Sequence, residues 1–432
     1  MIIGFHRGAD QAAPLACEQV GLDTIADAVG TPVYVYSQGL LEARARAWLD
    51  AMASVPGGVD IAYAIKANPN LAVVGVLARL GLGADVVSAG EMKRARAAGV
   101  PPSRIVFSGV GKTHAEMVAA LDAGVGQINL ESEIEGAELS AIAQARGVRA
   151  AVVLRVNPDV DAGTHAKITT GTAESKFGVA IDEAPAMYAR LAALPGLDLR
   201  GVAVHIGSQL LSLAPLEAAF ARVGTLLAEL RAAGQRVTHV DLGGGLGVGY
   251  REGEVPPMPA DYAAMLARVT AGWDVALTIE PGRSLVGEAG VLVTRVIRVK
   301  PGVVAPFVIV DAAMNDLARP ALYDAYHHFE PVAARPARMT ANIVGPVCES
   351  SDCFATRREI GVVGAGDLAV FRTAGAYGAT MASTYNSRAM VPEVLVSGGR
   401  WAVVADRIAP ETMMAAERVP EWVVASPEGA AA

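Results

Sequence analysis

Eight short runs of apolar and β-branched residues alternate with helix-forming segments from about Val33 onward, and this rhythm constrains the fold most. Parallel strands need long, usually helical, connections, so the alternation is typical of repeated βα units. The runs lie at residues 61–68, 84–89, 104–109, 126–132, 151–158, 201–209, 239–245 and 276–282. Segments of helical period between them include 89–99, 113–124, 132–147 and 216–234. Eight units favour a closed (β/α)8 barrel of the TIM type, although an open doubly wound sheet can produce the same alternation.

The polar residues help to choose between these folds, because each run is apolar at its start and polar, reactive or glycine-rich at its end. The ends carry Lys66, Ser88, Ser108, Glu131, Asn157, His205, the cluster Gly243 to Gly245, and Glu280. In a (β/α)8 barrel the C-terminal strand ends converge on one face, where such enzymes hold their active sites. The pattern therefore favours the barrel and predicts one pocket that collects these ends.

The helical rhythm fades after about Ser284, where β-rich runs with turn signals take over. We therefore expect an α/β chain in three parts. Residues 1–32 form a segment that joins the β domain, residues 33–284 form the barrel, and residues 285–432 form a mainly β C-terminal domain that completes the site.

Composition narrows the class of function. The 432 residues are 52% hydrophobic, enough for a large core, and the net charge of -8 with scattered basic residues argues against nucleic-acid binding. Three cysteines without paired spacing support neither a disulfide framework nor a zinc site. We find neither the order of a signal peptide nor an apolar run long enough to span a bilayer. We expect a cytoplasmic enzyme that acts on a small molecule, with no membrane or nucleic-acid partner.

Lys66 ends the first run, in YAIKANPN, among apolar neighbours. A single lysine at a strand end ordinarily reaches solvent. A desolvated lysine instead has its amine form favoured and can condense with an aldehyde, which is the property of a Schiff-base lysine. The sequence predicts such a desolvated amine at the barrel mouth.

Two further run ends suit a phosphorylated pyridine cofactor. The run DLGGGLGVGY (241–250) has glycines that let backbone N–H groups surround an anion such as a phosphate, although a flexible turn would look alike. Glu280, in TIEPGRS, could keep a pyridine nitrogen protonated and so make the ring an electron sink. The alternative for this carboxylate is a structural salt bridge with Arg283.

Three histidines have different expected roles. His205, in VAVHIGSQ, could stack on a cofactor ring with Ser208 as a phosphate or hydroxyl partner, or could be a satisfied core histidine. His327 and His328 lack acids or cysteines at metal spacing, so we interpret both as surface residues and expect no metal site.

Two motifs of the β domain carry further candidates. In MNDLARPALYDAYH, Arg319 and Tyr323 could meet a substrate carboxylate, because a guanidinium forms two parallel bonds with a carboxylate. In GPVCESSDCFA, Cys348 could deliver a proton and Glu349 could hold a substrate ammonium. Buried packing is the ordinary alternative for a lone cysteine.

At these residues the chain resembles the alanine-racemase-fold group of pyridoxal-phosphate enzymes, and within it the diaminopimelate decarboxylase family. The resemblance spans about Pro32 to about Asn386. Its blocks occur in the family's order: YAIKANPN, NPDVDAGTHAKITTG followed by SKFGV, HIGSQ, DLGGGLG, EPGR, NDLARPALYDAYH, GPVCESSDCFA and GAYGATMASTYNSR. It implies decarboxylation of meso-2,6-diaminopimelate to L-lysine and CO2 with pyridoxal 5'-phosphate, the last step of lysine biosynthesis.

The resemblance also implies residue roles. Lys66 would carry the cofactor, His205 would stack on its ring, Glu280 would meet the pyridine nitrogen, and either Cys348 or Lys66 would deliver the final proton. The phosphate would lie against residues that include Ser208, Gly243, Gly244, Gly245, Gly247, Gly282, Arg283 and Tyr377. The substrate would meet Arg283, Arg319, Tyr323, Glu349 and Tyr377, and Cys348 with Glu349 would come from the partner subunit of a homodimer.

Three alternatives remain open at this point. A decarboxylase of the same fold for ornithine, arginine or lysine would leave Arg283, Arg319 and Tyr323 without a distal carboxylate to bind. An amino-acid racemase usually opposes the pyridine nitrogen with Arg, whereas this chain offers Glu280. A non-catalytic cofactor-binding or regulatory homologue would have no need of Lys66, Cys348 and a whole β domain.

Overall fold

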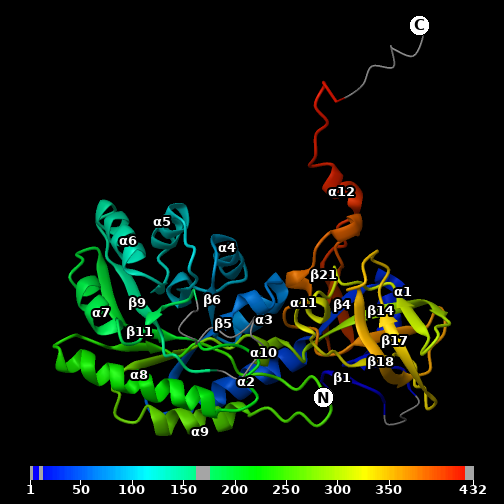
Figure 1. Cartoon of the computed structure of the whole chain (residues 1–432), viewed down its shortest axis with the longest axis horizontal. Coiled ribbons are helices and arrows are strands. Elements are labelled where there is room, and N and C mark those ends of the chain that lie inside the picture. The colour runs from blue at the N-terminus through cyan, green and yellow to red at the C-terminus, as the bar shows by residue number, and fades with distance from the viewer. Residues whose placement is uncertain (1–2, 9–12, 162–175, 424–432) are drawn as a thin grey trace.

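The computed structural model describes residues 3–8, 13–161 and 176–423, arranged as two bodies side by side (Figure 1). One body is a helix-covered barrel and the other is rich in β-strands. Residues 162–175, which hold most of the motif NPDVDAGTHAKITTG, lie outside the described residues.

The barrel is a closed ring of eight parallel strands, as the sequence predicts. Pairing of β8 with β9 and of β13 with β5 closes it, and the short β10 (Val179–Ala180) adds to the edge of β9. Most of these strands are buried along their length, and strands buried on both faces read as apolar runs in the sequence. The ring consists of β5 (Val59–Ala64), β6 (Gly83–Val86), β7 (Ile105–Phe107), β8 (Gln127–Leu130), β9 (Ala150–Asn157), β11 (Leu197–Val204), β12 (His239–Asp241) and β13 (Ala276–Ile279).

Helices surround this ring, and several begin at a side chain that caps them. Ser88 accepts a hydrogen bond from the Glu91 backbone N–H at the start of α4, and Thr113 forms a capping box with Glu116 at the start of α5. Ser88 therefore caps a helix and does not line the cavity described below. The helices are α2 (Gln38–Ala53), α3 (Leu71–Arg79), α4 (Ala89–Ala97), α5 (His114–Ala123), α6 (Glu133–Ala145), α7 (Ala184–Ala192), α8 (Ala214–Ala232), α9 (Pro259–Val269) and α10 (Arg283–Val286), with the 3-10 turns η1 (Ile65–Ala67) and η2 (Pro102–Arg104).

The second body is built around the long strand β14 (Gly290–Lys300), which pairs antiparallel with three neighbours. One neighbour is β4 (Val33–Ser37), so residues 33–37 belong to this sheet and not to the barrel, where the sequence rhythm placed them. The other strands are β15 (Phe307–Val310), β16 (Phe329–Pro331), β17 (Arg338–Val344), β18 (Cys353–Gly361), β19 (Leu368–Phe371), β20 (Glu393–Ser397) and β21 (Arg400–Ala405).

The N-terminal residues pack on the same body. β1 (Phe5–His6), β2 (Ala16–Cys17) and β3 (Val20–Gly21) form a small sheet followed by α1 (Leu22–Val29). Leu15, Leu22 and Ile25 share an apolar cluster with valines of β4, β14 and β20. This contact supports the proposed assignment of residues 1–32 to the β domain.

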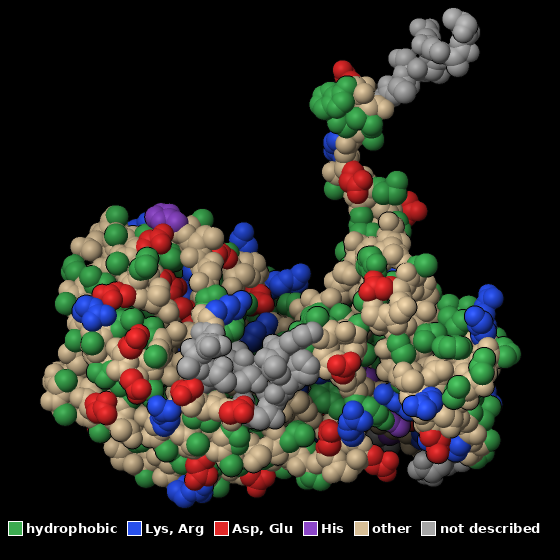
Figure 2. Space-filling model, viewed as in Figure 1, with side chains coloured by type: hydrophobic (Ala, Val, Ile, Leu, Met, Phe, Trp, Pro, Cys, Tyr) green, Lys and Arg blue, Asp and Glu red, His purple; other side chains and the backbone are tan. Residues whose placement is uncertain are grey.

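The remaining elements complete the β body and the junction between the two bodies. They are α11 (Arg319–Tyr323), η4 (Ala379–Met381), η5 (Tyr385–Ser387) and α12 (Pro410–Met414). At the junction the Tyr377 backbone N–H donates to the Ala67 carbonyl at 2.8 Å, directly beside Lys66. The segment from α12 to Val423 stands clear of the body (Figures 1 and 2). No helix in the described ranges is long and apolar enough to cross a membrane.

Candidate active site

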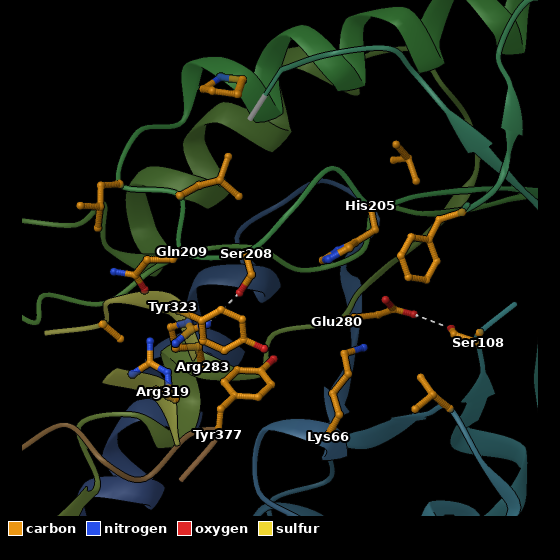
Figure 3. Close-up of a pocket in the computed structure, with 18 of the residues that line it drawn as sticks. Lys66, Ser108, His205, Ser208, Gln209, Glu280, Arg283, Arg319, Tyr323 and Tyr377 are labelled. Carbon is orange, nitrogen blue, oxygen red and sulfur yellow. Dashed lines mark hydrogen bonds between the residues drawn. The ribbon is translucent and has the colours of Figure 1, made fainter. Parts of the chain in front are cut away.

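A cavity of about 1110 Å³ opens where the C-terminal ends of the barrel strands meet the β body. Figure 3 shows two groups of side chains around it: Lys66, Glu280, His205 and Ser108 on one side, and two arginines with two tyrosines on the other. The expected residues that line it are Lys66, His205, Ser208, Glu280, Arg283, Arg319, Tyr323 and Tyr377. Sequence positions more than 300 residues apart therefore meet in one site.

Lys66 is paired with an acid that sequence reasoning missed. Its Nζ lies 2.6 Å from Oδ2 of Asp85, which is completely buried on β6. Burial opposes the ammonium form, but the carboxyl groups of Asp85 and Glu280 outweigh it and raise the pKa of Lys66. The expectation of a lysine held as a free amine by desolvation is therefore wrong. The signal was an acid within an otherwise apolar run.

Glu280 belongs to a buried group of carboxyl side chains. Burial, followed by the charges of Asp241 and Asp85, raises the pKa of Glu280 well above its usual value, and burial raises the pKa of Asp241 to about 6. The Ser108 hydroxyl donates to Glu280 Oε1 at 3.4 Å, and Gln127 donates to Asp241 at 3.0 Å. This side of the cavity holds three acids around one lysine, which favours a cationic ligand group there.

His205 lines the same part of the cavity. The Gly244 backbone N–H donates to its Nδ1 at 3.1 Å, which assigns the ring proton to Nε2. Burial, with the nearby charges of Arg155 and Lys66, lowers the pKa of His205 well below its usual value. His205 is therefore a flat, neutral ring at the cavity wall.

The opposite side of the cavity carries two buried guanidinium groups. Arg283 and Arg319 are each 6% exposed. Arg283 donates to Tyr250 Oη at 2.7 Å and to Ser208 Oγ at 3.1 Å, so its partners are neutral and the alternative salt bridge with Glu280 is not formed. Within the described residues neither guanidinium has an acidic partner. Tyr250 ends the glycine-rich run, where no pattern in the sequence marks it as a site residue.

His327 corrects a second expectation. It is not a surface residue: it is 1% exposed and its Nε2 lies 2.8 Å from Arg319 Nη1. His328, its neighbour, is exposed as expected. Two adjacent histidines look alike in the sequence because burial depends on the β-domain fold around them.

The glycines of the glycine-rich loop pack tightly but do not line the cavity. A Cβ on Gly243, Gly244 or Gly245 would lie 2.4, 2.2 or 2.6 Å from a backbone oxygen of Val204, Glu280 or Gly207. Close backbone packing therefore requires these glycines. Gly247 and Gly282 likewise lie outside the cavity lining.

Cys348 and Glu349 also lie away from this cavity within the single chain. The Cys348 side chain is exposed, and its backbone N–H bonds to Asn386 Oδ1 at 3.2 Å. Glu349 accepts hydrogen bonds from Ser351 at 2.5 Å and Tyr385 at 2.7 Å. These two residues cannot complete the site of their own chain in this arrangement.

Comparison with known proteins identifies the family. Residues 38–287 match the model of the pyridoxal-dependent decarboxylase, pyridoxal binding domain. A diaminopimelate decarboxylase from Zymomonas mobilis is 51% identical over 95% of this chain and 98% of its own. The chain belongs to the diaminopimelate decarboxylase family.

Solved structures of diaminopimelate decarboxylases agree with this assignment. The Helicobacter pylori enzyme complexed with L-lysine is 39% identical, with a TM-score of 0.87 over 91% of this chain and 98% of that chain. The M. jannaschii enzyme, in co-complex with L-lysine, is 33% identical, with a TM-score of 0.92 over 98% and 99%. The fold, the enzyme class and pyridoxal phosphate as cofactor, all expected from the sequence, are confirmed. The cavity fits this cofactor, because it offers a primary amine for the aldehyde and acids for a cationic ring nitrogen.

Proposed function

We propose that this chain decarboxylates meso-2,6-diaminopimelate to L-lysine and CO2 with pyridoxal phosphate. The observation that carries the proposal is the pair of buried guanidinium groups, Arg283 and Arg319, in the cavity that also holds Lys66 and Glu280. Buried cations without acidic partners favour a carboxylate ligand. A diamino dicarboxylic acid supplies one carboxylate to lose and a second to bind there. The names of the family relatives support the same substrate.

Residues of the barrel, together with Tyr377 of the β body, would hold the cofactor. Lys66 would bind it through Nζ, Glu280 would face the pyridine nitrogen, and His205 would cover one face of the ring. The phosphate of the cofactor would lie towards Ser208, Tyr377 and the loops that contain Gly243, Gly244, Gly245, Gly247, Gly282 and Arg283. When bound, pyridoxal phosphate supplies a ring that accepts the electron pair of a breaking C–COO bond.

Arg283 of the barrel and residues of the β domain would hold the far end of the substrate. Arg283, Arg319 and Tyr323 would bind the distal carboxylate, with Tyr377 beside it. This contact would orient the reacting carbon at the other end of the molecule. The same contact would distinguish diaminopimelate from ornithine, arginine and lysine, which lack a carboxylate at that end.

Cys348 and Glu349 would act across a homodimer interface. The exposed Cys348 of the partner subunit would deliver a proton from Sγ to the carbon that has lost CO2, unless Lys66 Nζ does so. The partner's Glu349 would hold the distal amine of the substrate. The site would be complete only in a dimer, which we propose to be cytoplasmic, in keeping with its free cysteines.

The proposed substrate is tested by measuring how much carbon dioxide each candidate amino acid releases. Purified protein is incubated with meso-diaminopimelate, ornithine, arginine or lysine, with and without added pyridoxal phosphate, and Lys66→Ala serves as the inactive control. We expect release from meso-diaminopimelate alone, with L-lysine as the product. Preference for ornithine, arginine or lysine would overturn the substrate while leaving the reaction type in place.

A further inference from the structure

His327 is a buried residue of the segment between α11 and β16, and its ring contacts the Arg319 side chain. Only 1% of it is exposed, and its backbone carbonyl accepts a hydrogen bond from Arg358 at 2.5 Å. The residue does not line the cavity, but its ring contacts Arg319 and Tyr250, which do.

The hydrogen bonds of His327 have one possible direction. A guanidinium donates and never accepts, so Nε2 of His327 accepts from Arg319 Nη1 at 2.8 Å. Nδ1 then carries the ring proton and donates to the Arg372 carbonyl at 2.9 Å, just after β19. A protonated ring could not accept from Arg319. Burial and the charge of Arg319 lower the pKa of His327 to about 3, so the ring is neutral at working pH.

Tyr250 completes the support of the two guanidinium groups. Its ring lies edge-on to His327 with centroids 5.3 Å apart, and 4.6 Å from Cζ of Arg319. The Tyr250 hydroxyl accepts from Arg283. Both arginines are therefore oriented by neutral groups. An acid in place of His327 or Tyr250 would orient the guanidinium groups equally well. It would, however, neutralise the positive charge that a carboxylate ligand needs.

We propose that His327 is a positioning residue that fixes Arg319 for the distal carboxylate of the substrate while leaving the guanidinium charge uncompensated. This inference rests on the proposed function. It assigns specificity for the carboxylate partly to a residue that never touches the substrate.

Three substitutions separate orientation from charge. His327→Gln keeps one acceptor and one donor, His327→Leu removes both, and His327→Glu keeps an acceptor but adds a negative charge. We expect His327→Gln to retain the wild-type KM for meso-diaminopimelate within about threefold. The Leu and Glu variants should raise KM about tenfold or more, with a smaller change in kcat, because an orienting hydrogen bond to a charged group is lost or its charge is cancelled. His328→Leu, next to it and exposed, is the matched control.

A pair of inhibitors distinguishes positioning from general damage. The product L-lysine keeps the distal carboxylate, whereas cadaverine lacks it. The Leu and Glu variants should weaken competitive inhibition by L-lysine about tenfold and leave cadaverine unchanged. Equal weakening of both inhibitors, or no change in either, would overturn the inference. If His327→Leu does not fold, the Glu and Gln variants decide by the same ratio.

The activity of the wild-type protein distinguishes failure of the proposed function from failure of the role of His327. If it decarboxylates meso-diaminopimelate and the inhibitor ratio does not respond to His327, only the role of His327 fails. If it has no activity on meso-diaminopimelate, both the proposed function and this inference fail.

Discussion

Lys66 lies beside a group of three buried carboxyl side chains on the barrel side of the cavity. Asp85 contacts its amine directly, and Glu280 and Asp241 lie next in the same polar group. The acids raise the pKa of Lys66, so less of it is the amine that attacks an aldehyde at neutral pH. A cofactor that brings a cationic ring nitrogen to Glu280 relieves the crowding of negative charge.

Asp85→Asn should therefore speed capture of pyridoxal phosphate by the cofactor-free protein at pH 7. Each unit by which the pKa of Lys66 falls increases the amine fraction about tenfold, and we expect the rate of capture to rise in the same proportion. Stopped-flow absorbance after cofactor addition measures it, and borohydride trapping with mass spectrometry checks that Lys66 is the modified residue. A rate that is unchanged or slower in the Asn variant contradicts this account of Asp85.

His327 should make the protein sensitive to acid. Burial, with the charge of Arg319, holds its pKa at about 3 against 6.5 in the unfolded chain, so the folded state binds fewer protons between these values. Its contribution to stability is present above pH 6.5 and is lost as pH falls, by about 2 kcal/mol between pH 7 and pH 5. His205 acts with the same sign, and Glu280 and Asp241 act with the opposite sign.

The measurement compares urea unfolding at the two pH values in wild type and His327→Gln. The variant, which has no titrating ring, should lose about 2 kcal/mol less than the wild type. His114→Gln, on the exposed start of α5, is the control and should behave as wild type. Equal losses in all three proteins would show that His327 is not held neutral.

The part of the site that could be predicted from the sequence consists of residues at strand ends. Lys66, His205 and Glu280 stand at the ends of predicted strands, and strand ends of a parallel barrel meet by geometry alone. Asp85 and Tyr250 contact these residues only after the strands have paired and the loops have folded. His327 and His328 differ only in which side chain the β body covers, and nothing in their local sequence encodes that.

At the scale of elements, all eight predicted runs are barrel strands, because strands buried on both faces leave an apolar run that period and length can identify. The sheet to which a strand belongs is another matter. β4 precedes the first barrel helix and reads like another barrel strand, yet it pairs with β14 and β20. Such long-range pairing has no local signature.

The close packing of the glycine-rich loop predicts that a substitution at Gly244 is costly. Gly244→Ala would place a Cβ 2.2 Å from the Glu280 carbonyl oxygen, so the loop after β12 or the end of β13 must move. We expect a loss of about 1–3 kcal/mol in stability and weaker binding of pyridoxal phosphate, because Glu280 moves with its backbone. Thermal unfolding and cofactor titration measure the two effects.

Gly75→Ala in α3 is the matched control. Its Cβ would meet only the Ala98 carbonyl oxygen at 3.7 Å, which is an ordinary contact. Alanine in a helix is favoured over glycine, so this variant should be unchanged or more stable by up to about 1 kcal/mol. A Gly244→Ala protein as stable as this control would contradict the packing argument.

The two bodies of the molecule contribute different side chains to the cavity. The barrel contributes Lys66, His205 and Glu280, and the β body contributes Arg319, Tyr323 and Tyr377. The backbone contact between Tyr377 and Ala67 ties the two sets together next to the lysine. Cys348 lies on the β body but outside this cavity, so its proposed role requires the cavity of another copy.

Mixing two inactive variants tests that requirement. Lys66→Ala lacks the amine but presents an intact Cys348, and Cys348→Ala has the reverse defect. In a symmetric dimer with shared sites, each heterodimer contains one site with both residues intact and one with neither. Free exchange of subunits makes half of the dimers mixed, so activity should recover to about a quarter of wild type.

Mixing Lys66→Ala with Glu280→Gln, two changes in the same barrel, should recover nothing, because no site is then intact. Recovery in neither mixture, with subunit exchange verified by native mass spectrometry, would mean that Cys348 does not act across subunits.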